Sequence, residues 1–138
     1  MIVCVLSAEK KRWGFPIVYA NRCLETATGY LRKDVIGKKF LSSHLVSCDI
    51  AQIDTIEAVS TALAKGKSLK INVTTKRSDY LYRSYILFLK PIFDETGNYM
   101  YMFSLQYDIT SDGKIFKLSL TAFNWCCLFY DRIDVSSN

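Results

Sequence analysis

Residues 16–38, PIVYANRCLETATGYLRKDVIGK, constrain the fold of this chain more than any other segment. A β-branched and aromatic run over residues 17–19 stops just before Asn21, a residue type that caps helices well. About two turns of helix are then expected to end at Gly29, and a second short helix over residues 31–36 to end at the next glycine. A strand that leads into two such brief helices is uncommon in globular domains, so this segment admits few folds.

One longer helix is expected over residues 50–65. Apolar residues recur there at three- and four-residue spacing, which indicates one face turned toward a sheet. Asp49 and Gln52 are arranged like a capping box at its start, and Gly66 supplies its end.

Five β-prone runs are expected to form strands: residues 1–7, 15–19, 69–75, 80–93 and 99–110. A short loop containing Gly97 joins the last two, which predicts a β-hairpin. Two strands, several helices and then three strands predict an α+β fold, with a five-stranded antiparallel sheet and the helices on one face.

The chain has 138 residues, half of them hydrophobic, which suits one domain with a sizeable core. Asp112 and Gly113 are expected to close that domain, so the chain divides into a domain over residues 1–112 and a hydrophobic tail over residues 113–138. The apolar spacing of the tail is compatible with a helix or with a strand. We expect it to pack on the sheet or to mediate association.

Composition and spacing argue against several classes of function. The 18 basic and 13 acidic residues give a net charge of +5, but the basic residues are spread over different loops, so we expect no binding of nucleic acid. Five cysteines without a CxxC pair and a single histidine, His44, do not make a metal site. With one histidine and no phosphate-binding glycine motif, we expect a protein that is not an enzyme.

Two further observations set the expected location. No apolar run approaches the roughly 20 residues that a membrane-spanning helix needs. No basic and apolar leader precedes the first expected strand. We therefore expect a cytoplasmic protein with no transmembrane segment.

Sequence elements in two segments of the chain carry a resemblance to a known family. The elements PIVYAN, TGY and DVIGK within residues 16–38, together with QYDIT at residues 106–110, resemble the PAS domain family, and the similarity extends over residues 2–111. Within that family the chain is most similar to LOV-type photosensors and to the PAS caps of voltage-gated potassium channels. The resemblance implies a PAS domain over residues 1–112, with a sheet that cups a small internal cavity beneath the helices. It also implies a sensory, signal-transducing role.

The resemblance does not extend to the photochemistry of LOV domains. The position of the family's reactive cysteine falls on Phe40, whose phenyl ring cannot form an adduct with flavin. The positions of two flavin-contacting asparagines fall on Val73 and Arg83, and Gln106 alone matches the flavin-contacting glutamine. The leading expectation is therefore a chain without a cofactor. The alternative is a sensor that binds flavin or another cofactor without adduct chemistry.

Strand alternation predicts which residues would line such a cavity. With Gln106 facing inward as in the family, the residues two and four positions before it share its face. The candidate cavity residues are Phe40, Ile71, Val73, Arg83, Tyr85, Leu87, Met102, Ser104 and Gln106. An inward-facing Arg83 calls for a small anionic ligand, oriented by Tyr85 and Gln106. The alternative is a closed core in which Arg83 reaches the rim or pairs with an acid such as Asp79.

The opposite face of the sheet is predicted to be apolar as well. Its candidate interaction residues are Tyr82, Ile86, Phe88, Tyr99, Tyr101, Phe103, Leu105 and Tyr107. A sheet with one face in water should alternate apolar and polar residues, so something must cover this face. The candidates are the aromatic tail at residues 116–130, a second copy of the domain, or a protein partner.

These observations favour a non-enzymatic sensory module that acts through protein–protein interaction or dimerisation at that face. Binding of a small ligand in the cavity is a further option. The alternatives are the flavin-binding sensor without adduct chemistry and a regulatory cap of a larger protein such as an ion channel.

Overall fold

The computed structural model describes residues 1–43, 45 and 53–109. His44, the expected capping box at residues 49–52 and the tail at residues 113–138 lie outside the described residues. The end of the domain at Asp112 lies outside them too, and it stays a prediction.

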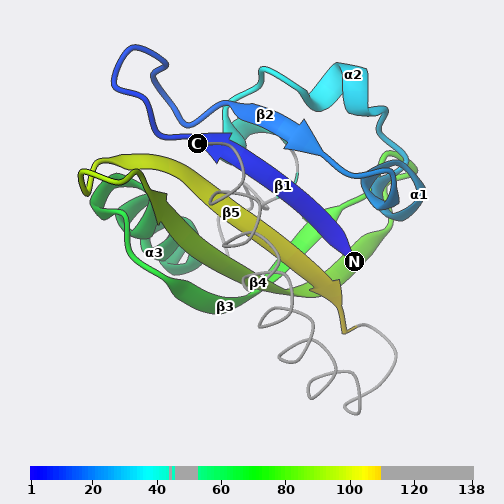
Figure 1. Ribbon diagram of the computed structural model, residues 1–138. Coiled ribbons are helices and arrows are strands. Elements are labelled where there is room, and N and C mark those ends of the chain that lie inside the picture. The colour runs from blue at the N-terminus through cyan, green and yellow to red at the C-terminus, as the bar shows by residue number, and fades with distance from the viewer. Residues whose placement is uncertain (44, 46–52, 110–138) are drawn as a thin grey trace.

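The described residues fold around one antiparallel sheet of five strands (Figure 1). The strands are β1 (Ile2–Ser7), β2 (Ile17–Ala20), β3 (Leu69–Lys76), β4 (Tyr82–Phe93) and β5 (Tyr99–Asp108), and they lie in the order β2-β1-β5-β4-β3. The first and the last of these strands, β1 and β5, are therefore neighbours within the sheet, with Cys4 opposite Ser104. This arrangement confirms the expected α+β fold, and each expected strand overlaps an observed one.

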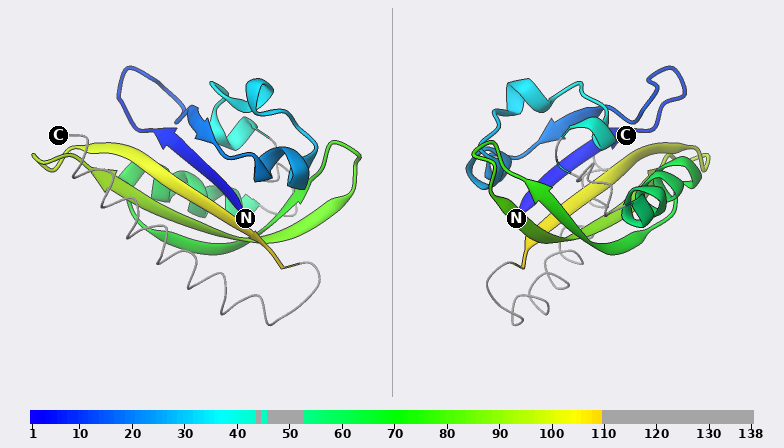
Figure 2. Two further views of the ribbon diagram at one scale, coloured as in Figure 1. Left: turned by 45° about the vertical axis from the view of Figure 1, so that its right-hand side comes forward. Right: turned by 180° about the vertical axis from the view of Figure 1, so that it is seen from behind.

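The helices connect β2 to β3 and lie on one face of the sheet (Figure 2). They are α1 (Cys23–Thr28), α2 (Arg32–Val35), the 3-10 helix η1 (Phe40–Ser42) and α3 (Ile53–Lys65). One buried cluster joins Leu24 of α1, Phe40 of η1 and Leu63 of α3 to Leu6 and Leu87 of the sheet. We call the sheet face that these helices cover the inner face, and the opposite one the outer face.

The two short helices are followed by glycines, as the sequence predicts. Gly29 and Gly37 have φ values of 78° and 88°, a region that other residues enter only with a steric cost at Cβ.

The expected helix cap at Asn21 is wrong, because its side chain bonds to the sheet instead. Its Oδ1 accepts a hydrogen bond from the Val3 N–H at 3.0 Å, and its Nδ2 donates to the Met1 carbonyl at 2.9 Å. Asn21 follows β2 directly, and β2 pairs antiparallel with β1, so the start of β1 lies within reach of its amide. The residue thus fixes the entry into α1 by tying it to β1.

Alternate residues of β4 pack into two clusters, one on each face of the sheet. Tyr85, Leu87 and Leu89 belong to the inner cluster, while Ile86 and Phe88 belong to the outer one. Successive side chains of a strand point to opposite faces, so an apolar run along β4 makes both faces apolar.

Candidate functional site

The candidate cavity residues face the interior as alternation predicts, and most of them are fully buried. Those exposed by no more than 2% are Phe40, Val73, Tyr85, Leu87, Met102, Ser104 and Gln106. Ile71 is partly buried and packs against the same cluster. The structure therefore brings eight of the nine candidates together between the sheet and the helices, and it leaves only Arg83 at the edge.

Gln106 is a fully buried polar side chain of this interior, and part of its hydrogen-bonding capacity is unused among the described residues. Its Nε2 donates a hydrogen bond to the Leu45 carbonyl at 2.5 Å. Its Oε1 has no hydrogen-bond partner among the described residues. Leaving a buried acceptor unpaired costs about 1–3 kcal/mol. This oxygen is therefore suited to accept a hydrogen bond from a bound group.

Arg83 lies at the rim of the interior. Its side chain is 37% exposed, and its Nη1 lies 3.9 Å from Oδ2 of Asp108. Asp79, the acid suggested by the sequence, instead lies 3.4 Å from Nε of Arg77. Because Asp108 offsets the guanidinium charge and water reaches both groups, no buried anion is needed to balance Arg83. The geometry thus agrees with the alternative in which the Arg83 side chain reaches the rim of the interior.

Tyr85 is buried beside this charged rim. Burial raises the pKa of its phenol, the negative charge of Asp108 raises it further, and the charges of Arg77 and Arg83 lower it. Since the net shift is upward from a value near 10, the phenol keeps its proton at neutral pH.

The outer face carries a second buried cluster, on its central strands. Its four members, exposed by 6% or less, are Ile86, Phe88, Phe103 and Leu105. The partly buried apolar residues packed against them are Val3, Val5, Ile92 and Ile109. The edge strands differ, because Tyr19 of β2 is 51% exposed and Lys70 and Asn72 of β3 are exposed. The buried apolar stripe thus runs over β1, β5 and β4.

Three other candidate interaction residues lie beside this stripe. Tyr101 and Tyr107 are partly buried, opposite Ile92 and Ile86, and Tyr82 is 56% exposed at the start of β4. Burial therefore falls off from the centre of the outer face toward Tyr82.

The placement of Tyr99 on the outer face is wrong. Its ring packs against the inner cluster, with its centroid 6.4 Å from that of Phe15 and 5.9 Å from that of Phe93. The pairing of β4 with β5 is irregular between Ile92 and Phe93, so simple alternation fails at this end of the hairpin. Burial raises the pKa of the Tyr99 phenol to about 12, and its hydroxyl has no hydrogen-bond partner among the described residues.

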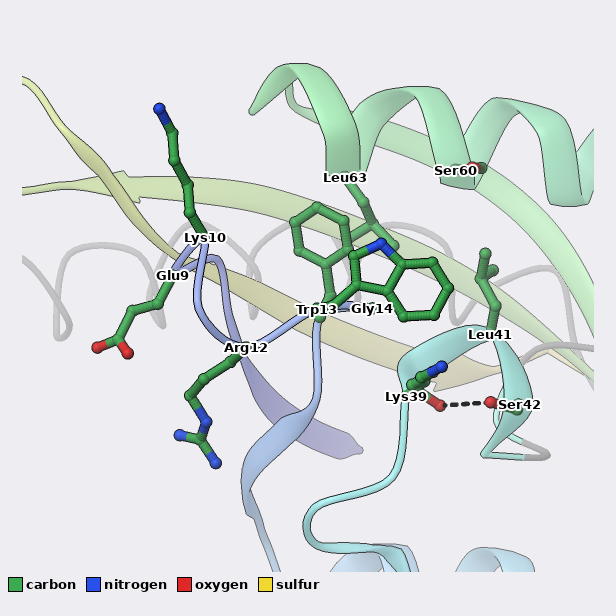
Figure 3. Close-up of a pocket in the computed structure, with 11 residues that line it drawn as sticks. Glu9, Lys10, Arg12, Trp13, Gly14, Lys39, Leu41, Ser42, Ser60 and Leu63 are labelled. Atoms are coloured by element: carbon green, nitrogen blue, oxygen red, sulfur yellow. Dashed lines mark hydrogen bonds between the residues drawn. The ribbon is translucent and has the colours of Figure 1, made fainter.

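A groove that sequence reasoning missed lies between the β1–β2 loop, η1 and α3 (Figure 3). Its volume is about 470 Å³, and none of the nine candidate cavity residues lines it. Its apolar walls come from Trp13, Phe15, Leu41 and Leu63, with Lys39 and Ser60 as polar neighbours. The available signal was Trp13 next to a glycine, an aromatic residue in a charged turn that no periodic element explained.

The remaining side chains bear on chemistry in a few ways. Cys4 is buried, and burial raises the pKa of its thiol to about 12, which suppresses the reactive thiolate. Within residues 1–43, 45 and 53–109, no three His, Cys, Asp or Glu side chains gather in a way that could hold a metal ion. In that same part of the chain, no helix has the length and apolar character needed to cross a membrane.

Comparison with known proteins adds a family and a set of fold relatives. A family model described as PAS domain matches residues 3–111. Among solved structures, an RNA-binding Light-Oxygen-Voltage receptor is 24% identical with a TM-score of 0.68, and the alignment covers 79% of this chain and 30% of that chain.

Two bacterial LOV structures are also similar. A LOV protein of Rhodobacter sphaeroides has 18% identity and a TM-score of 0.70, with 83% of this chain and 62% of that chain covered. The LOV domain of a blue-light activated histidine kinase from Erythrobacter litoralis has 19% identity and a TM-score of 0.68, with 80% and 96% covered. At these identities the likeness concerns the fold, and this chain spans less than two thirds of the first two proteins.

Proposed function

This chain belongs to the PAS domain family, and from that premise we propose that it is a non-enzymatic signalling module that works through the outer face of its sheet. The observation that carries this proposal is the burial of Ile86, Phe88, Phe103 and Leu105 to 6% exposure or less. The apolar neighbours packed on them within the described ranges belong to the same sheet or, for Ile109, directly follow β5. A single layer of sheet does not bury its own face to this degree, which supports a separate cover.

The proposed cover is the chain's own hydrophobic segment, residues 113–138. Signalling then consists of exchanging that segment for a second copy of the domain or for a protein partner. Such an exchange needs two covers of similar free energy on the same face, so that a signal can shift the balance between them. The exposed edge residue Tyr19 and the polar outer side of β3 confine any cover to the central stripe.

The proposal is tested on the full chain with Phe103→Asp. A carboxylate in the middle of the stripe is costly to bury, so the cover is expected to dissociate while the inner core stays intact. We expect limited proteolysis within residues 113–138 to accelerate about tenfold or more, with an unchanged far-ultraviolet circular dichroism spectrum. Native mass spectrometry of both proteins reports whether a second copy is gained or lost.

Tyr19→Asp is the matched control, because it adds the same charge to the same face at an exposed edge. It is expected to leave proteolysis and oligomeric state as in the wild type. If Phe103→Asp changes neither the proteolysis of residues 113–138 nor the oligomeric state, the outer face is not a site of exchange and the proposal is wrong.

A second candidate function, binding of a small ligand in the interior, rests on Gln106. Its unpaired Oε1 would accept one hydrogen bond from a ligand that offers an N–H or O–H group. The flavin ring has such a group, but the phosphate of a flavin nucleotide would need a cation, and Arg83 at the rim is already paired with Asp108. The described residues therefore fit a flavin poorly, and a smaller, less polar ligand fits them better.

An absorbance spectrum and a native mass of the purified chain test this second candidate together. Retention of a small molecule, and its loss from Gln106→Leu, would support an interior ligand. A mass equal to that of the bare chain, with no absorbance beyond that of the aromatic residues, would count against it.

A further inference from the structure

We infer that the groove beside Trp13 is a second ligand site, and that it takes a small aromatic carboxylate. The groove is lined by the β1–β2 loop, η1 and α3, on the helix side of the sheet (Figure 3). The outer face is on the other side, so this inference stands or falls separately from the proposed function.

The backbone of the β1–β2 loop sends its two aromatic residues in different directions. Gly14 and Phe15 both have positive φ values, 87° and 55°. A residue with a Cβ is held in this region only at a cost of about 1–2 kcal/mol, which the surroundings must offset. Phe15 packs on the inner cluster and its carbonyl accepts a hydrogen bond from the Phe40 N–H at 3.3 Å, whereas Trp13 stays 78% exposed.

Trp13 is nevertheless held in a defined pose. The ammonium of Lys39 lies 3.8 Å from the centroid of the indole ring, a cation–π contact. The aliphatic part of Lys39 crosses Gly14 so closely that a Cβ there would lie 2.6 Å from its Cγ. A glycine at this position therefore lets the lysine reach the ring, and the pair forms one preset edge of the groove.

The size and walls of the groove suit a small molecule. Its volume of about 470 Å³ lies within the range of roughly 300–1,000 Å³ that is usual for ligand pockets. Phe15, Leu41 and Leu63 form its apolar walls, and Ser60 of α3 adds a hydroxyl. The flat apolar surface of Trp13 favours an aromatic ligand, because aromatic rings gain from offset or edge-to-face packing.

The charge around the groove specifies an anion. Lys10, Arg12 and Lys39 are opposed by Glu9 alone among the lining residues. Figure 3 shows Glu9, Lys10 and Arg12 extending away from the indole ring, which leaves Lys39 as the cation beside it. A carboxylate on the ligand would pair with this ammonium while its ring packs on Trp13.

The test follows the indole N–H signal of Trp13 by NMR in the full chain. The chain has two tryptophans, so loss of one signal in Trp13→Phe assigns it. Phenylacetate, indole-3-acetate and 2-naphthoate are titrated beside their neutral amides. At least one acid is expected to shift the signal saturably, with a Kd below about 1 mM. Its neutral amide is expected to bind at least about fivefold more weakly.

Three variants separate charge from shape. Lys39→Met keeps an unbranched side chain over Gly14 and removes the charge. It should therefore weaken binding of the acid about fivefold more than binding of the amide. Lys38→Met is the matched control, an exposed neighbour that does not line the groove, and should bind as the wild type does. Ser60→Phe fills the groove from an exposed position of α3 and should abolish binding of the acid.

Three results would overturn the inference. One is the absence of a saturable shift for all three acids up to about 10 mM. Another is equal affinity for each acid and its amide. The third is equal weakening by Lys38→Met and Lys39→Met, which would reduce the effect to the general positive charge of the chain.

Discussion

The inner face of the sheet and the central stripe of its outer face are both apolar and both buried, but they are buried in different ways. On the inner face, helix residues such as Leu24 and Leu63 share one cluster with Leu87. On the outer face, the described apolar neighbours of Phe103 and Leu105 belong to the sheet itself or directly follow its strand β5. A cover that is interleaved with the core cannot leave without unfolding the domain, whereas a cover laid on a finished sheet can. The inner face therefore maintains the fold, and the outer face is the better place for a reversible contact.

The largest expected effect on stability comes from truncating one buried leucine to alanine on each face of the sheet. Leu87 and Leu105 are both 0% exposed, one on each side of the sheet. We expect Leu87→Ala to lower the free energy of unfolding by about 3–5 kcal/mol, and Leu105→Ala by only about 2–3 kcal/mol, because the proposed separate cover can settle into the space left behind. Urea denaturation of both variants measures the difference. Equal losses would mean that the outer face is as integral to the core as the inner one.

A smaller effect, on the pH dependence of stability, tests how well the inner face shields Cys4 from water. Burial raises the pKa of Cys4 from 9.0 to about 12, so above pH 9 the unfolded chain releases a proton that the folded chain keeps. The unfolded state then binds fewer protons, and the free energy of unfolding falls as pH rises from 9 toward 12. Between pH 8 and pH 10 the wild type should lose about 1.4 kcal/mol more than Cys4→Ala. Parallel losses in the two proteins would show that the thiol is not shielded.

Two tyrosines of β5, one on each face, provide a comparison in which the inner-face substitution is expected to stabilise the domain. The hydroxyl of Tyr99 is buried without a partner in the described structure, so Tyr99→Phe should stabilise the domain by about 0.5–1 kcal/mol. Tyr101→Phe is the control on the outer face, where we expect a change within about 0.5 kcal/mol. A destabilised Tyr99→Phe would reveal a hydrogen bond to this hydroxyl.

The smallest effect is expected at the rim between the faces. Arg83 and Asp108 are 37% and 44% exposed and 3.9 Å apart, so their pairing is screened by water. Arg83→Leu should change the free energy of unfolding by less than about 1 kcal/mol and leave any interior ligand in place. If native mass spectrometry instead shows that Arg83→Leu loses a small molecule bound by the wild type, the result would support the internal anion site that the sequence suggested.

Much of the fold followed from local patterns. Glycines marked the ends of α1 and α2, and the period of two along β4 assigned Tyr85 and Leu87 to one face and Ile86 to the other. The candidate site was less predictable from such patterns. Alternation assigned Arg83 to the inner face but left open whether its side chain lies inside or reaches the rim, because alternation gives a direction but not a depth, and a long side chain at a strand end can reach water.

The sequence by itself determined the element order, the family and the apolar character of both sheet faces, since each of these depends on residue spacing along one segment. The tertiary structure alone decided which acid pairs with Arg83, which face receives Tyr99, and that Trp13 meets Lys39 across Gly14. Strand register brings Arg83 near Asp108, and the irregular end of the hairpin turns Tyr99 inward. Two positive φ angles, at Gly14 and Phe15, shape the loop that carries Trp13. Periodicity carries no information about such long-range geometry, which is why the groove beside Trp13 emerged only from the folded chain.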